Sequence, residues 1–322
     1  MKRLLLFVLL AGCLDSAELV PETVDEDPTL PAIEISDTRL HAEAFGDPDA
    51  PIVLILHGGP GGDYRAMMPL AALADDGYRV VFWDQRGAGL SRRHAYDSYT
   101  FAGYLEDLRL VIDHYTTHAG QPVVFIGHSF GAMYSTWFID TYADYGGRIR
   151  GSVLSEPGAF TKAQLDQFSS RQNASIDLFA EQLGDIAWQD QFLRPSDQAR
   201  ADYLDTLGSM VGTPSEHRDP NNLAPLWRSG SVVRNALFAL AKRDGFDWTQ
   251  HLSAFQTPVV FIRGDLNTAC PLDQQQQLAS AYPHASIVTI QNVGHQMQWE
   301  RPVEYLADVR AYLATLDLAV HP

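Results

Sequence analysis

The chain is poor in cysteine, in long apolar runs and in clustered basic residues. Of its 322 residues only Cys13 and Cys270 are cysteines. No apolar run approaches the roughly 20 residues that a membrane-spanning helix needs. The 23 basic residues form no run and stand against 40 acidic ones, for a formal net charge of −17. Because nucleic acid is bound by clustered Lys and Arg, we expect no nucleic-acid partner.

Residues 1–12 have the pattern of an export signal, with a basic start, an apolar stretch from Leu4 to Leu10 and small residues after it. The segment Leu10-Ala11-Gly12-Cys13 resembles the lipobox of bacterial lipoproteins. This resemblance implies that Cys13 is lipidated and becomes the first residue. The expected location is then the bacterial cell envelope, with a membrane as partner through the anchor. A plain secretory signal with an incidental cysteine is the alternative.

With Cys13 lipidated, Cys270 would be the one cysteine of the mature chain with a free thiol, which excludes an internal disulfide. Residues 13–30 carry six acidic residues, no basic residue and two prolines. Such a composition cannot bury a core. We therefore predict a solvated acidic tether over residues 13–30.

The rest of the chain alternates between strand-like and helix-like patterns, which predicts an α/β fold with a mostly parallel sheet flanked by helices. Ile33 to Phe45 reads as a hairpin. Strands are further expected at Ile52–Leu56, Val80–Trp83, Val123–Ile126, Ser152–Leu154, Val259–Ile262 and Ser286–Ile290.

The interval 158–253 shows helix-like stretches and no convincing strand, and it is too long for a loop. Its helical patterns cover Gln164–Leu183, Ser196–Leu207 and Ser231–Lys242. We predict a helical cap over 158–253, inserted into a core formed by 31–157 and 254–322. The cap is expected to cover the end of the sheet that carries the site.

The candidate nucleophile is Ser129, in the segment V-V-F-I-G-H-S-F-G-A over 123–132. An apolar strand runs into G-x-S-x-G, and a helical pattern follows. This order is typical of a nucleophile elbow, a sharp turn that presents the serine hydroxyl. An ordinary strand–helix turn is the alternative.

Serine requires a base to take its proton and a carboxylate to orient that base. Asp265 follows the strand Val259–Ile262, and His295 follows the strand Ser286–Ile290. The order Ser129, Asp265, His295 is the serine–acid–histidine order of α/β-hydrolases. Glu156, directly after the strand Ser152–Leu154, is the rival acid; a substrate-binding or structural role is its other option.

The segment His57-Gly58-Gly59-Pro60-Gly61-Gly62 follows the strand Ile52–Leu56. Glycine lets the backbone approach a substrate closely, and a developing oxyanion needs backbone N–H donors. We expect the amides of Gly59 and Phe130 to form the oxyanion hole. His57 is expected to hold this loop by hydrogen bonds rather than to transfer protons.

The chain resembles the proline iminopeptidase branch of the α/β-hydrolase fold family in three features: these glycines, the segment D-Q-R-G-A-G-L-S over 84–91, and the Ser129 elbow. The resemblance extends over most of the chain after residue 30. It implies a cap domain, no metal or organic cofactor, and cleavage of N-terminal residues from peptides or small amides. Asp84 and Arg86 are interpreted as structural.

The chain also departs from those peptidases, which bind the free amine of the substrate with cap glutamates. The corresponding segments here read Val233-Arg234-Asn235-Ala236-Leu237 and Ala187-Trp188-Gln189-Asp190, and Phe130 stands where tryptophan is usual. Glu156, Glu181 or Glu216 could supply the carboxylate. A carboxylesterase acting on small acyl esters is the alternative function, and a non-catalytic binding protein of this fold is a further one.

Overall fold

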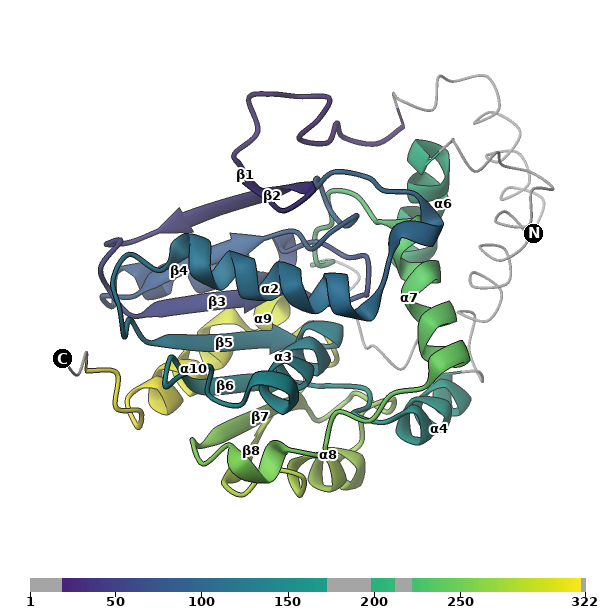
Figure 1. The fold of residues 1–322 in the computed structure, drawn as a ribbon. Coiled ribbons are helices and arrows are strands. Elements are labelled where there is room, and N and C mark those ends of the chain that lie inside the picture. The colour runs from purple at the N-terminus through teal and green to yellow at the C-terminus, as the bar shows by residue number, and fades with distance from the viewer. Residues whose placement is uncertain (1–18, 173–197, 212–221, 320–322) are drawn as a thin grey trace.

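The computed structural model describes residues 19–172, 198–211 and 222–319. Within these ranges one eight-stranded sheet runs in the order β1-β2-β4-β3-β5-β6-β7-β8 (Figure 1). Its strands are β1 (Ala32–Ile35), β2 (Thr38–Phe45), β3 (Ile52–Leu56), β4 (Arg79–Trp83), β5 (Val123–His128), β6 (Ile149–Ser155), β7 (Val259–Gly264) and β8 (Ala285–Ile290). The pairs β1–β2 and β2–β4 are antiparallel, and the remaining pairs are parallel. The predicted fold class is confirmed.

Helices cover both faces of the sheet, because the central strands are apolar on both sides. In β5, Val123 and Phe125 belong to one apolar core, whereas Val124 and Ile126 belong to the other. The helical elements of the core domain are η3 (Arg65–Ala74), η4 (Tyr96–Ser98), α2 (Phe101–Tyr115), α3 (Phe130–Tyr142), α8 (Leu272–Ala279), α9 (Met297–Glu300) and α10 (Pro302–Leu313). Residues of α2, α3 and α8 pack into the first core, and residues of η3, α9 and α10 pack into the second.

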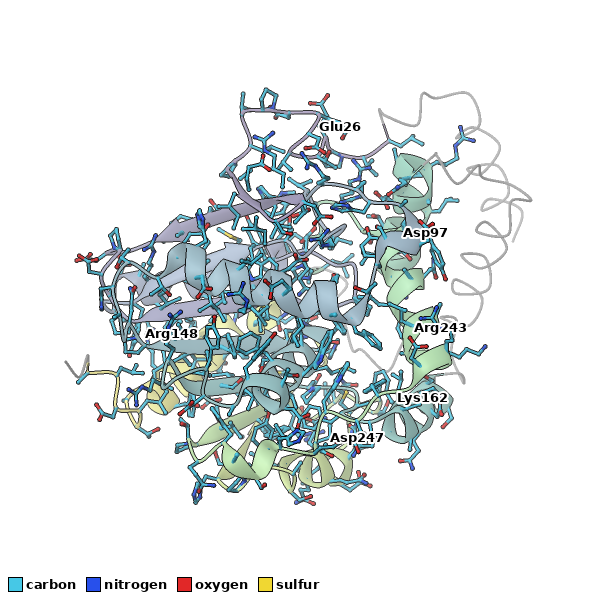
Figure 2. The ribbon with its side chains drawn as sticks, viewed as in Figure 1. Glu26, Asp97, Arg148, Lys162, Arg243 and Asp247 are labelled. Carbon is cyan, nitrogen blue, oxygen red and sulfur yellow. The ribbon has the colours of Figure 1, made fainter. Side chains whose placement is uncertain are left out.

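The helices α4 (Lys162–Gln172), α6 (Gln198–Val211) and α7 (Ser231–Asp244) lie between β6 and β7 in the sequence. They occupy the interval for which a helical cap is predicted, and in Figure 1 they lie at the right-hand end of the sheet, with α7 between α6 and α4. A short bridge between Thr161 and Asp247 joins the start of α4 to the chain after α7; Lys162 and Asp247 mark this region in Figure 2. The predicted helix Gln164–Leu183 is found as far as Gln172, and its remainder lies outside the described residues.

Residues 19–30 differ from the predicted tether, because they pack against the fold. Val20, Thr23 and Val24 are buried. The amide of Val24 donates a hydrogen bond to the carbonyl of Leu90 at 2.8 Å. The expectation of a fully solvated segment over residues 13–30 is therefore wrong for its described part, 19–30.

Three arginines from distant parts of the chain hold this N-terminal segment. Arg92 forms two hydrogen bonds with the Asp25 carboxylate, at 2.7 and 2.9 Å. Arg228 donates from Nη1 to the Pro21 carbonyl at 2.9 Å, and Arg39 donates to a backbone carbonyl of the same segment. Figure 2 shows Glu26 of this segment beyond β1. Residues 1–18, which include Cys13, lie outside the described residues. None of the helices in the described ranges is both long and apolar enough to span a bilayer.

Candidate active site

Ser129 occupies the turn between β5 and α3, with φ 55° and ψ −117°. This conformation is unfavourable for a residue with a side chain, by roughly 1–3 kcal/mol. Its amide donates to the carbonyl of Ser155 at 2.7 Å. The glycines on either side are required by close backbone approach: a Cβ at Gly131 would lie 1.9 Å from the carbonyl oxygen of Leu56, and one at Gly127 would lie 2.5 Å from that of Gly131. The local geometry is that of a nucleophile elbow.

His295 follows β8 and lies beside the elbow. The ring of His128, the residue before Ser129, is 4.4 Å from the ring of His295 between centroids. On its other side, Nδ1 of His295 is 2.6 Å from Oε2 of Glu156. A histidine held through Nδ1 by a carboxylate leaves Nε2 to act as a base, which is the arrangement that a serine nucleophile requires.

Glu156 is fully buried directly after β6. Its Oε1 accepts a hydrogen bond from the Gly264 amide at 2.8 Å, and its Oε2 accepts one from Nδ2 of Asn267 at 2.6 Å. The Asn267 side chain is oriented in turn by its Oδ1, which accepts from the amide of Ala269 at 3.0 Å. With His295 included, three donors converge on one carboxylate. Each of these donors faces an oxygen of the carboxylate, so both oxygens of Glu156 are held in place.

Asp265 lies on the neighbouring turn, after β7. Its Oδ1 accepts a hydrogen bond from the amide of Val293 at 3.3 Å, and its own amide donates to the carbonyl of Ile290 at 3.0 Å. Its carboxylate therefore supports the backbone that precedes His295, while Glu156 contacts the imidazole. This corrects two expectations: that Asp265 orients His295, and that Glu156 is available to bind substrate.

The rival acid was recognisable from its place directly after a strand, whereas the contribution of Asn267 was not expected. The strands β6, β7 and β8 are adjacent and parallel, so acids that follow β6 or β7 both come close to the turn after β8. The order of the strands therefore does not determine which of the two carboxylates points toward the histidine.

Glu156, Cys270 and His295 each offer one donor atom within 4.8 Å of the others, which is a composition that could hold a metal ion. The 2.6 Å between His295 and Glu156 is, however, a direct hydrogen-bond distance. Two ligands of a tetrahedral zinc ion with bonds of about 2.0 Å would stand about 3.3 Å apart. The observed distance therefore fits a hydrogen-bonded pair better than two ligands of one metal ion.

The predicted oxyanion loop lies against the elbow. A Cβ at Gly58 would be 3.1 Å from Cβ of Ser129. His57 is fully buried; its Nδ1 donates to the Gly58 carbonyl at 2.8 Å, and its Nε2 accepts from the amide of Gln85 at 3.0 Å. His57 thus holds this loop by hydrogen bonds, and burial lowers its pKa below the usual 6.5. Phe130 is the first residue of α3, where amides have no acceptor within the helix.

The start of α7 meets the same loop. The amide of Gly230 donates to the carbonyl of Gly61 at 2.7 Å, and a Cβ at Gly61 would lie 2.5 Å from the Gly230 carbonyl oxygen. Behind it, the buried carboxylate of Asp63 accepts hydrogen bonds from the amides of Trp227 and Arg228, at 2.5 and 3.1 Å. The predicted cap interval is therefore joined to the oxyanion loop at its helix α7.

Asp84 and Arg86 make structural contacts in the segment 84–91. The Asp84 carboxylate accepts from Nδ1 of His41 at 2.8 Å and from the amides of Tyr64 and Leu90, at 3.1 and 2.8 Å. Arg86 forms two hydrogen bonds of 2.7 Å with the buried Asp107.

In α7, Arg234 forms an ion pair with Asp205 of α6 at 2.5 Å. Glu181, Glu216 and the segment 187–190, which were considered for amine recognition, lie outside the described residues.

The sheet, its covering helices and the elbow define an α/β-hydrolase. The chain belongs to the serine aminopeptidase S33 family, whose model matches residues 47–302. The proline iminopeptidase PfmaB of Pestalotiopsis fici is 26% identical over 298 residues, covering 87% of this chain and 98% of that protein. Epoxide hydrolase A of Mycobacterium tuberculosis is 27% identical over 326 residues, covering 90% and 99%.

A solved thermophilic esterase from Thermogutta terrifontis superimposes with a TM-score of 0.61 at 20% identity, covering 88% of this chain and 98% of that one. Family and relatives are enzymes of the α/β-hydrolase class, and so is this chain. The alternative of a non-catalytic binding protein is therefore set aside.

Proposed function

We propose that this enzyme is a serine hydrolase with the triad Ser129, His295 and Glu156. The observation that carries the proposal is the 2.6 Å hydrogen bond between His295 and Glu156, formed beside the serine elbow. Glu156 directly follows β6, which pairs with the elbow strand β5.

In the proposed reaction, Nε2 of His295 takes the hydroxyl proton of Ser129 as the serine oxygen attacks the substrate carbonyl carbon. The resulting oxyanion accepts hydrogen bonds from the amides of Gly59 and Phe130. His295 then passes the proton to the leaving amine or alcohol, and an acyl-enzyme remains. Water, deprotonated by His295, attacks this ester, and the carboxylic acid leaves as Ser129 regains its proton. Glu156 keeps the imidazole in the tautomer that leaves Nε2 unprotonated.

For the substrate we propose a small molecule or peptide, with N-terminal residues cleaved from peptides or small amides as in proline iminopeptidases. The S33 family match and the relative PfmaB, named a proline iminopeptidase, support this choice. Epoxide hydrolase chemistry is disfavoured despite the similarity to epoxide hydrolase A, because an alkyl-ester intermediate needs a carboxylate nucleophile and Ser129 stands at the elbow.

A carboxylesterase is the second candidate. Phe130 replaces the tryptophan usual in those peptidases, and Glu156 is engaged by His295 and is not available to bind an amine. An ester substrate without a free amine needs no carboxylate of the enzyme to bind one.

The deciding experiment compares three chromogenic substrates with the purified enzyme: a prolyl amide with a free amine, its N-acetylated form and a short acyl ester. The variant Ser129→Ala is the control for each. Cleavage of the free-amine amide, with the N-acetylated form resistant, supports the aminopeptidase. Cleavage of the ester alone supports the carboxylesterase. Turnover that persists in Ser129→Ala overturns the serine mechanism.

We further propose that Cys13 carries a lipid anchor that holds the enzyme in the cell envelope. The lipobox-like sequence before Cys13 supports this. A membrane-bound substrate is not required, since such an anchor only fixes where the enzyme works.

A further inference from the structure

His128, within the elbow sequence, connects two parts of the site that come from distant segments. Its Nε2 lies 2.8 Å from the backbone carbonyl oxygen of His295. On the opposite side of the ring, a Cβ placed at Gly58 would be 3.1 Å from Nδ1 of His128. The imidazole therefore lies between the turn that carries His295 and the predicted oxyanion loop.

The contacts determine which nitrogen of His128 carries the proton. A carbonyl oxygen can only accept, so Nε2 must donate to His295. His128 is buried, and this burial, reinforced by the neighbouring His295, holds its pKa well below the usual 6.5. The ring is thus neutral at physiological pH, with its single N–H on Nε2. Protonation of the ring at Nδ1 would leave this donor in place.

The same ring also restricts the orientation of the His295 side chain. The two imidazole planes are inclined by 43° with centroids 4.4 Å apart. Glu156 and Asn267 both contact Nδ1 of the His295 ring, at 2.6 and 3.3 Å. Contacts at one ring atom fix that atom more firmly than they fix the tilt of the ring. A neighbouring ring in contact with its face restricts this tilt, and the bond to the His295 carbonyl fixes the backbone from which the ring projects.

We propose that His128 is a positioning residue, which holds the backbone and ring of His295 at the correct distance from Ser129 and keeps the Gly58 loop against the same elbow. This inference rests on the proposed serine mechanism. It assigns to the residue between Gly127 and Ser129 a role in aligning the base, in addition to its part in the turn.

The test compares His128→Gln and His128→Leu with the unchanged enzyme. The Gln side-chain amide can donate toward the His295 carbonyl, whereas Leu fills similar space without a donor. We expect His128→Leu to lower kcat roughly 10- to 100-fold at nearly constant KM, a range usual for residues that orient a catalytic group. We expect His128→Gln to recover most of this loss.

The assay uses whichever chromogenic substrate the unchanged enzyme cleaves, together with the rate of Ser129 acylation by a fluorophosphonate. Thermal melting of each variant shows whether it is folded at the assay temperature. His118→Leu, at the opposite end of β5, is the matched control and should leave kcat unchanged. A folded His128→Leu enzyme with unchanged kcat and acylation rate, or equal losses in the Gln and Leu variants, overturns the inference. If the unchanged enzyme neither turns over substrate nor reacts with the fluorophosphonate, the proposed function itself fails.

Discussion

The Nδ1 atom of His295 lies 2.6 Å from Oε2 of Glu156, while the carboxylate of Asp265 accepts a hydrogen bond from the Val293 backbone. Two acids thus stand near one histidine turn in different roles. One orients the imidazole, and the other supports the chain that leads to it. Conservative amide substitutions separate these roles, because they remove a charge with little change of shape.

We expect Glu156→Gln to lower kcat by roughly 10³- to 10⁴-fold. At one position the new NH₂ group would face the Gly264 amide, and at the other it would face the N–H groups of His295 and Asn267. In the second arrangement the imidazole would turn to the tautomer whose Nε2 is protonated and cannot act as a base, and in both arrangements the charge that stabilises the imidazolium is lost. Steady-state kinetics on the cleaved substrate measure this loss.

The matched variant is Asp265→Asn. Its side-chain oxygen can still accept from the Val293 amide, so kcat should stay within about threefold of the unchanged enzyme. The opposite pattern, with a large loss in Asp265→Asn and little in Glu156→Gln, would return the acid to the turn after β7.

A second prediction concerns the contact between the oxyanion loop and the elbow. A methyl group at Gly58 would lie 3.1 Å from both Cβ of Ser129 and Nδ1 of His128, so the loop must move by a few tenths of an ångström. We expect Gly58→Ala to fold but to lose roughly tenfold in kcat, because small displacements of reacting groups are costly. Gly103→Ala, in the first turn of α2, is the control and should keep full activity. A Gly58→Ala enzyme with the kcat of the unchanged enzyme would contradict the view that the position of this loop against the elbow matters for turnover.

The pH dependence of stability provides a third prediction. Burial keeps the pKa of His128 below 6.5 in the folded chain, so below pH 6.5 the unfolded chain binds a proton that the folded chain does not. The free energy of unfolding therefore falls as the pH is lowered from 6.5, by up to about 1.4 kcal/mol per pH unit for this group.

Urea unfolding at pH 7, 6 and 5 measures this contribution as the difference between the unchanged enzyme and His128→Gln. We expect His128→Gln to lose less stability on acidification than the unchanged enzyme. Groups that do not interact with His128, such as Asp63 with its raised pKa, are common to both proteins and cancel in the difference. Parallel curves would show that His128 takes up a proton in the folded chain as readily as in the unfolded one.

Much of the architecture can be predicted from the periodicity of apolar residues in the sequence. The run Ile52–Leu56 was predicted with the observed bounds of β3, and the elbow was placed at Ser129 because a strand, a glycine pattern and a helix occur there in order. Such features are local in sequence. The choice between Glu156 and Asp265 was not local, because it depends on which of two neighbouring turns directs its carboxylate toward the residue after β8.

The N-terminal segment was misjudged for the same reason. Its charges suggested a solvated chain, yet its partners Arg39, Arg92 and Arg228 come from distant positions. Two valines within the acidic run, Val20 and Val24, are buried. Amino-acid composition describes the segment as a whole and does not single out these two valines. The folded structure shows that they are buried against the rest of the protein.

The packing of this segment leads to a fourth prediction. Val24 is fully buried, so Val24→Asp places an unpaired charge against the fold and should lower the free energy of unfolding by roughly 2–4 kcal/mol. Pro28→Asp adds the same charge at an exposed position four residues further on and should have little effect. Thermal melting of both variants checks this. Equal melting temperatures for Val24→Asp and the unchanged enzyme would restore the view of a solvated tether.

The packed segment also limits where a lipid anchor could hold the enzyme. The buried Val20 lies seven positions after Cys13, and an extended chain spans at most about 25 Å over seven positions. If Cys13 is lipidated, the folded domain therefore stays close to the bilayer. We expect Cys13→Ser to move the enzyme from the membrane fraction to the soluble fraction of the cell envelope, whereas Cys270→Ser should leave it in the membrane fraction. An unchanged distribution of Cys13→Ser on fractionation would contradict the anchor, and the leader would then be a plain secretory signal.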